Sequence, residues 1–190
     1  MFRRFLGTVA PTPAVPSREL AKATAQTSGE TATVRRIVAR LESMPADRAR
    51  LIASAAYTLA RAAHADLHIS DEETTAIEQE LQRDGALDEP TAVLVTEMAK
   101  LQARTVGGTE DYVVTREFKA LATPEQRLDV MRACFAIGAA SGTISAEEAA
   151  VLNQIAGELD IDAPALNAIR AEFRDRMSSV QRVRRLGGAG

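Results

Sequence analysis

The stretch HADLHISDEE at 64–73 decides the fold, because a second version, AASGTISAEE, follows at 139–148. Both versions end in Ile-Ser, one variable residue and two glutamates. A serine three residues before a glutamate is a helix-start signal. The serine hydroxyl accepts from the backbone N–H of the glutamate, and the carboxylate accepts from that of the serine. The duplication therefore predicts two helix–loop–helix junctions of the same construction.

Apolar residues recur at the 3.6-residue period of a helix on both sides of each junction. No stretch alternates apolar and polar residues long enough to form a strand, so the predicted fold class is all-α. We expect helices at about 46–65 and starting near Ser70, Asp88, Thr109, Thr123, Ser145 and Asp162. Their predicted buried faces include Ile77 and Leu81, then Val93, Leu94, Met98 and Leu101, then Tyr112, Val113 and Phe118, then Met131 and Phe135, and finally Leu152 and Ile155.

The helices form two similar groups, which predicts an internal repeat. Residues 1–29 are a basic N-terminal segment with a Pro-rich linker, 30–176 are the helical domain, and 177–190 are a basic, Gly-rich tail. Within the domain, 46–104 and 123–173 each hold three helices. We expect these two units to pack as one compact helical bundle about a pseudo-twofold axis.

Charge and apolar content limit the classes of partner. The net charge is −3, but residues 64–89 hold nine acidic residues against Arg83 alone. This acidic segment argues against nucleic-acid binding, and the chain has two tyrosines and no tryptophan on which bases could stack. We therefore expect a protein partner and no nucleic acid. The single cysteine, Cys134, lies among apolar residues and is predicted to be a buried, inert thiol.

The N-terminus bears on localisation. MFRRFLG at 1–7 has two arginines but no apolar run behind it that would form an export signal. No segment has the ~20 apolar residues that span a bilayer, so we expect a cytoplasmic protein. Phe2, Phe5 and Leu6 beside two arginines leave a peripheral membrane contact through residues 1–6 as an open alternative.

The acidic residues of the first junction are the candidates for a ligand site. Capping explains Glu73 and Glu148, but Asp66 ends a helix, where the helix dipole disfavours a carboxylate. Asp66 is therefore the residue that a cation site would explain. The spacing lacks the glycine and the final glutamate of an EF-hand. Any site for calcium or a similar divalent ion would be weak, on the order of 10⁻⁴–10⁻³ M.

The sequence holds no pattern that predicts catalysis. It contains no Walker loop, HExxH motif, Gly-rich dinucleotide turn or evident nucleophile–base pair. His64 and His68 are four residues apart, but no cysteine or third histidine follows nearby to complete a zinc site. We therefore expect a non-catalytic protein.

The doubled junction resembles that of the tellurite-resistance TerB-like family, whose members repeat Ala-Asp-Gly-x-hydrophobic-x-x-x-Glu in a compact helical domain. The matching stretches are ADLHI at 65–69 with Glu73 and ASGTI at 140–144 with Glu148. The resemblance covers about residues 46–175. It implies a role in metal-oxyanion or chemical stress and an acidic cation-binding cluster.

Two departures from the family pattern weaken that implication. Leu67 stands where the first copy should have glycine, and Ser141 stands where the second should have aspartate. With the family's residues carried over, the candidate metal ligands are Asp66, Glu73 and Glu148. The Ser70 oxygen of the first copy is a further candidate ligand for calcium. The predicted function is a non-catalytic TerB-like module whose acidic face binds a cation or a partner. The alternative is a pure protein- or membrane-interaction domain with no metal site. The sequence leaves the oligomeric state open.

Overall fold

The chain divides into two units, residues 1–42 and 43–190. The computed structural model describes residue 39 and residues 42–66, 68–83, 87–106 and 108–187, almost all of them in the second unit. Residues 1–6, for which a peripheral membrane contact is the open alternative, lie outside the described residues, as does the linker.

The prediction of an all-α fold is confirmed. The described part of the chain holds helices and one isolated bridge between Ile144 and Met177, and no strand. None of the described helices is long and apolar enough to cross a membrane. In chain order the elements are α2 (Ala46–Ala63), η1 (His64–Asp66), α3 (Asp71–Gln82), α4 (Glu89–Val106), α5 (Thr109–Leu121), α6 (Pro124–Gly138), α7 (Ala146–Glu158), α8 (Ala163–Glu172), η3 (Arg174–Arg176) and α9 (Ser178–Gly187).

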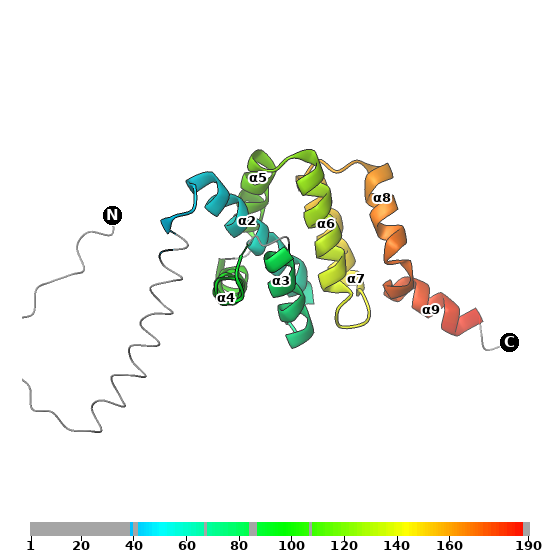
Figure 1. The fold of residues 1–190 in the computed structure, drawn as a ribbon. Coiled ribbons are helices and arrows are strands. Elements are labelled where there is room, and N and C mark those ends of the chain that lie inside the picture. The colour runs from blue at the N-terminus through cyan, green and yellow to red at the C-terminus, as the bar shows by residue number, and fades with distance from the viewer. Residues whose placement is uncertain (1–38, 40–41, 67, 84–86, 107, 188–190) are drawn as a thin grey trace, which may run out of the picture. The chain divides into compact units, whose positions relative to one another are not determined.

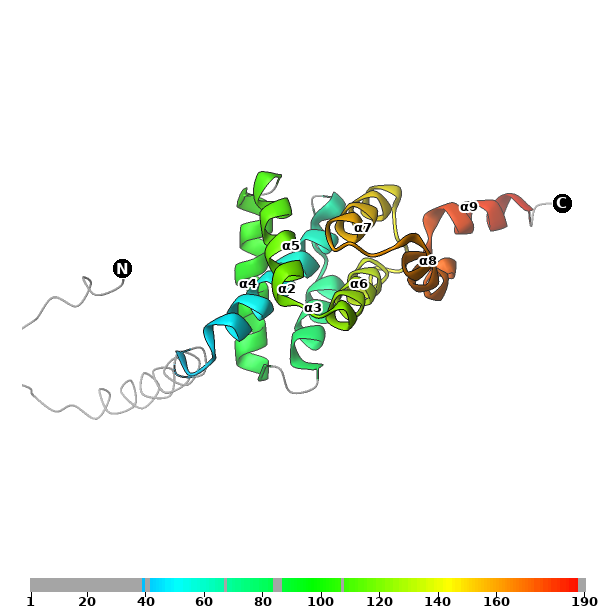
Figure 2. The same cartoon turned by 90° about the horizontal axis from the view of Figure 1, so that it is seen from above.

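Helix α2 lies at the centre of the second unit, in contact with α3, α4, α5, α6 and α7 (Figure 1). Its buried residues include Ala56, Ala60 and Ala63, whose small side chains allow neighbouring backbones to approach closely. Seen from above, α4 and α5 lie on one side of the unit, and α8 and α9 lie at the other end (Figure 2). Helix α2 therefore contacts every helix that carries a candidate functional residue.

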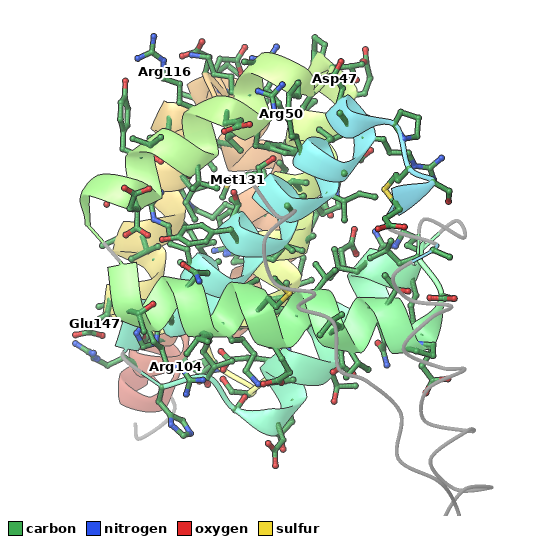
Figure 3. The ribbon with its side chains drawn as sticks, turned by 90° about the vertical axis from the view of Figure 1, so that its left-hand side faces the viewer. Asp47, Arg50, Arg104, Arg116, Met131 and Glu147 are labelled. Carbon is green, nitrogen blue, oxygen red and sulfur yellow. The ribbon has the colours of Figure 1, made fainter. Side chains whose placement is uncertain are left out.

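Most of the predicted buried faces are confirmed. Ile77 and Leu81 of α3 are buried, as are Met131 and Phe135 of α6 and Ile155 of α7. Figure 3 shows Met131 in the middle of the unit, surrounded by helices. The helical period therefore identified the inward side of α3, α6 and α7 correctly.

The prediction for α4 is wrong. Its side chains Val93, Leu94, Met98 and Leu101 are 39%, 38%, 58% and 53% exposed. The buried side of α4 instead consists of small residues, Thr91, Ala92, Thr96, Ala99 and Ala103. The physical reason is that α4 packs on both α2 and α3, which its smallest side chains let it approach most closely.

The start of α5 differs from the prediction for a related reason. Tyr112 and Val113 are about half exposed, whereas Phe118 is buried as expected. In this first turn the inward position belongs to Asp111, which contacts buried polar groups of α2. A charged contact thus takes the place that an apolar face was predicted to fill.

The proposed pseudo-twofold relation between 46–104 and 123–173 stays a prediction. The two groups share the order of helix, junction, helix and third helix. Their third helices pack differently, because α4 packs on both α2 and α3 whereas α8 packs mainly on α6. Residues 178–187, which the sequence analysis assigns to a basic tail, form helix α9.

Cys134 is fully buried in α6, and burial raises the pKa of its thiol to about 12. Since the thiolate is the reactive form, we expect no reaction with a thiol reagent such as DTNB at neutral pH while the protein is folded. One thiol per chain should react after unfolding in urea. Fast labelling of the native protein would contradict this burial.

Candidate functional site

The first junction is a capping box built as the sequence predicts. The Ser70 hydroxyl accepts from the N–H of Glu73 (3.2 Å), and Glu73 Oε2 accepts from the N–H of Ser70 (2.8 Å). The same Oε2 also accepts from the Ser70 hydroxyl (2.9 Å). Glu73 is only 4% exposed, so its carboxylate stabilises the start of α3 from inside the unit.

The second junction repeats this geometry at the start of α7. The Ser145 hydroxyl accepts from the N–H of Glu148 (3.1 Å), and Glu148 Oε2 accepts from the N–H of Ser145 (2.6 Å). Glu148 is also 4% exposed and lies against α6, where a Cβ on Gly138 would be 3.6 Å from its Oε1. The interpretation of both glutamates as helix-capping residues is confirmed.

The second junction has an additional role that the sequence did not indicate, because it holds the chain that follows α8. The N–H of Ile144 donates to the carbonyl of Arg176 (2.8 Å), and that of Ser178 donates to the carbonyl of Ile144 (2.9 Å). The Thr143 hydroxyl donates to Oε1 of Gln181 (3.0 Å). We call residues 176–181 the C-terminal strap.

A glycine shapes the turn that meets this strap. Gly142 has φ +107°, a conformation that side chains rarely adopt, and its carbonyl accepts from Arg176 Nη1 (3.5 Å). This turn is where the second copy has serine in place of the family's aspartate, and that Ser141 is exposed. The second junction is thus bonded to the strap beside the position where the aspartate is missing.

The predicted metal ligands are only partly brought together. Ser70 and Glu73 are bonded to each other, whereas Glu148 belongs to the other junction. The side chain of Asp66 is not among the described parts of the molecule, so its role as a ligand stays a prediction. Among the side chains that the structure does describe, no group of three or more His, Cys, Asp or Glu is placed to hold a metal ion.

A buried ion cluster that was not predicted from the sequence joins α2, α5 and α7. Arg61 of α2 makes two hydrogen bonds to Glu158 of α7, from Nη1 to Oε2 (2.6 Å) and from Nη2 to Oε1 (3.1 Å). These two side chains are only 6% and 8% exposed. Arg61 also donates to the Thr115 hydroxyl (3.0 Å), and its Nε lies 3.6 Å from Asp111 Oδ2. The cluster ties three helices at one point.

Asp111 extends this cluster to the start of α5. Its Oδ1 accepts from the Tyr57 hydroxyl (2.8 Å), and its Oδ2 accepts from the N–H of Gly108 (2.9 Å). Burial, followed by this hydrogen bond to Asp111, raises the pKa of Tyr57 well above its usual value. Tyr57 therefore stays protonated and acts as a donor, and the arrangement is one of mutual stabilisation among fully paired groups.

The sequence contained a signal for this cluster. Arg61 stands in TLARAAH at 58–64, where all residues from Thr58 to Ala63 are buried. A charged residue on a buried helix face requires an oppositely charged partner. The identity of that partner, 97 residues along the chain, depends on the fold alone.

The exposed apolar side of α4 is the other feature that calls for a function. We call Leu94, Met98 and Leu101 the α4 stripe, because their spacing places them on one side of the helix. Helix α4 crosses the face of the unit turned to the viewer in Figure 3, with Arg104 beside its C-terminal end. Large apolar side chains that gather on an exposed face are typical of interaction surfaces.

The buried side of α4 makes this exposure more informative. Thr91 and Thr96 face inward, and their hydroxyls have no hydrogen-bond partner among the residues that the structure describes. Burial of a polar group without a partner costs free energy, and so does exposure of Leu and Met to water. An orientation of α4 that buries the threonine hydroxyls and exposes Leu and Met is favoured when another molecule or another segment of the chain covers the α4 stripe.

Comparison with known proteins identifies a family. The family model described as Tellurite resistance protein TerB matches residues 51–171. Neither the curated proteins nor the solved structures contain a match. The matched residues run from α2 to α8 and include both capping boxes, the buried ion cluster and the α4 stripe. The chain therefore belongs to the TerB family.

Proposed function

We propose that this protein is a non-catalytic TerB module of a metal or chemical stress response, which acts by binding a protein partner through the α4 stripe. The observation that carries the proposal is the exposure of Leu94, Met98 and Leu101 on one helix face. Bound protein would remove these side chains from water, at roughly 25 cal/mol per Å² of apolar area covered. The role in stress response rests on the family alone, which is named for tellurite resistance.

Capping favours protein binding over metal binding as the main activity. Glu73 accepts two hydrogen bonds at its helix start, and Glu148 is buried at its own. A metal ion would have to compete with these backbone hydrogen bonds for the same oxygens. The exposed acids of α3, such as Asp71 and Glu72, attract cations only as a diffuse charge. A specific cation site at Asp66 stays a separate prediction.

The experiment is complementation of a strain that lacks the gene, with growth measured over a range of tellurite concentrations. We expect wild-type protein to restore tolerance and Met98→Glu to fail, because a buried charge at a protein interface opposes binding. Met98 is 58% exposed, so the variant should fold normally. Ala150→Glu is the matched control, since it adds the same charge at an exposed position of α7.

The stress role and the α4 stripe as binding surface can each be contradicted separately. If loss of the gene leaves tellurite tolerance unchanged, the stress role is wrong for tellurite. If Met98→Glu restores tolerance as well as Ala150→Glu does, the α4 stripe is not the working surface. Circular dichroism of both purified variants would establish that they are folded.

A further inference from the structure

We propose that the α4 stripe is covered by α4 of a second copy of this chain, in antiparallel orientation, so that the working protein is a twofold dimer. This inference rests on the proposed function in that it names the partner of the α4 stripe. The spacing of the apolar residues and the placement of the charges beside them support it.

The spacing fits a helix that pairs with another helix. Leu94, Met98, Leu101 and Thr105 follow one another at intervals of four, three and four residues, and all four are exposed. This is the alternation of the two seam positions in a coiled coil, whose side chains insert between those of a partner helix. Helix α4 has 18 residues, so it is about 27 Å long at 1.5 Å per residue.

Antiparallel pairing brings the seam residues opposite one another. In such a pair each position of one seam type faces a position of the other type in the partner. Met98 then faces Leu101 of the second copy, and Leu94 faces Thr105. By symmetry the same contacts form twice about the twofold axis. The contact involves only about three turns of each helix. Because this contact is short, we expect the fraction of dimer to rise with protein concentration.

Charge complementarity selects this orientation. Glu97 and Arg104 are seven residues apart, so they lie on the same side of the seam, and both are exposed. In the antiparallel register given above, Glu97 of each copy lies beside Arg104 of the other, which makes two ion pairs of opposite charge. In a parallel pair Glu97 would lie beside Gln102 and would gain no such partner.

Within the part of the chain that the structure describes, one of these groups has no ion-pair partner. Glu97 already bonds Lys100 one turn later (2.7 Å), whereas Arg104 makes no ion pair within the described part of the chain. Figure 3 shows Arg104 at the edge of the face that α4 crosses. Its guanidinium is thus placed to meet a carboxylate from outside the chain.

The test is sedimentation velocity of the full-length protein over a range of concentrations, with charge-reversal variants. We expect wild type to dimerise, and Glu97→Arg and Arg104→Glu each to raise the dissociation constant by roughly tenfold or more, since each places like charges together twice. The double variant Glu97→Arg/Arg104→Glu should return it to near the wild-type value. Arg116→Glu, an exposed reversal on α5, is the matched control.

Rescue by the double variant is the decisive readout, because only a partner that carries the same two residues can produce it. A wild type that stays monomeric at all concentrations overturns the inference, and so does a double variant weaker than either single one. In the first case a different protein or another segment of this chain covers the α4 stripe. Failure of Met98→Glu in the tellurite experiment would then still support the proposed function, so the two proposals can fail separately.

Discussion

Replacement of Arg61 by methionine is expected to lower the free energy of unfolding by about 3–5 kcal/mol. The substitution keeps a long apolar side chain but removes the cation that neutralises Glu158 and Asp111. Glu158 is 8% exposed, so it would remain as a buried charge without its partner. Equilibrium unfolding in urea, followed by circular dichroism, measures the loss.

Arg50→Met is the matched control, because it removes an arginine from the same helix. Arg50 bonds Glu117 at 2.8 Å, but its side chain is 55% exposed, so we expect a much smaller cost than for Arg61→Met. Addition of Glu158→Leu to Arg61→Met should recover part of the loss, since both buried charges are then gone. Equal costs for the two arginine variants would show that the buried cluster contributes no more than a surface pair.

The second large effect is expected at the capping glutamates. Glu148→Ala should lower the free energy of unfolding by about 2 kcal/mol, since the N–H of Ser145 loses a charged acceptor in a buried place. Glu73→Ala should have a similar effect on α3. Urea unfolding again measures both, and the exposed neighbours Glu147 and Glu72 serve as controls with expected changes within about 0.5 kcal/mol.

The same variants distinguish a helix cap from a metal ligand. A bound ion stabilises the folded protein in proportion to the logarithm of its concentration above the dissociation constant. If the glutamates act only as caps, millimolar calcium leaves the thermal midpoint of the wild type unchanged. Stabilisation of the wild type by calcium, absent from Glu73→Ala, would instead assign Glu73 to a cation site.

The two junctions could be predicted from the sequence because their interactions are local. Ser70 and Glu73 are three residues apart, and the capping box depends only on that spacing and on the helix that follows. The same holds for Ser145 and Glu148. The helical period likewise located the buried sides of α3, α6 and α7, which each have one apolar side.

Helix α4 could not be oriented in this way because it has two sides that are free of charge. One carries Leu94, Met98 and Leu101, and the other carries alanines and threonines. The larger apolar side chains favour burial of the first side. Close approach of the α4 backbone to α2 favours burial of the second side, whose side chains are small. The outcome depends on a neighbour about 40 residues earlier in the chain, which a local pattern does not encode. The partner of Arg61 is hidden for the same reason.

Because of the C-terminal strap, the two junctions complete their hydrogen bonds at different stages of synthesis. The bonds within the first junction span three or four residues, so they can form soon after that segment leaves the ribosome. The second junction waits for Gln181, 38 residues beyond Thr143, before its turn is fully bonded. Contacts of long sequence separation form later and cost more loop entropy. The first junction can therefore complete its hydrogen bonds while the second still awaits its last residues.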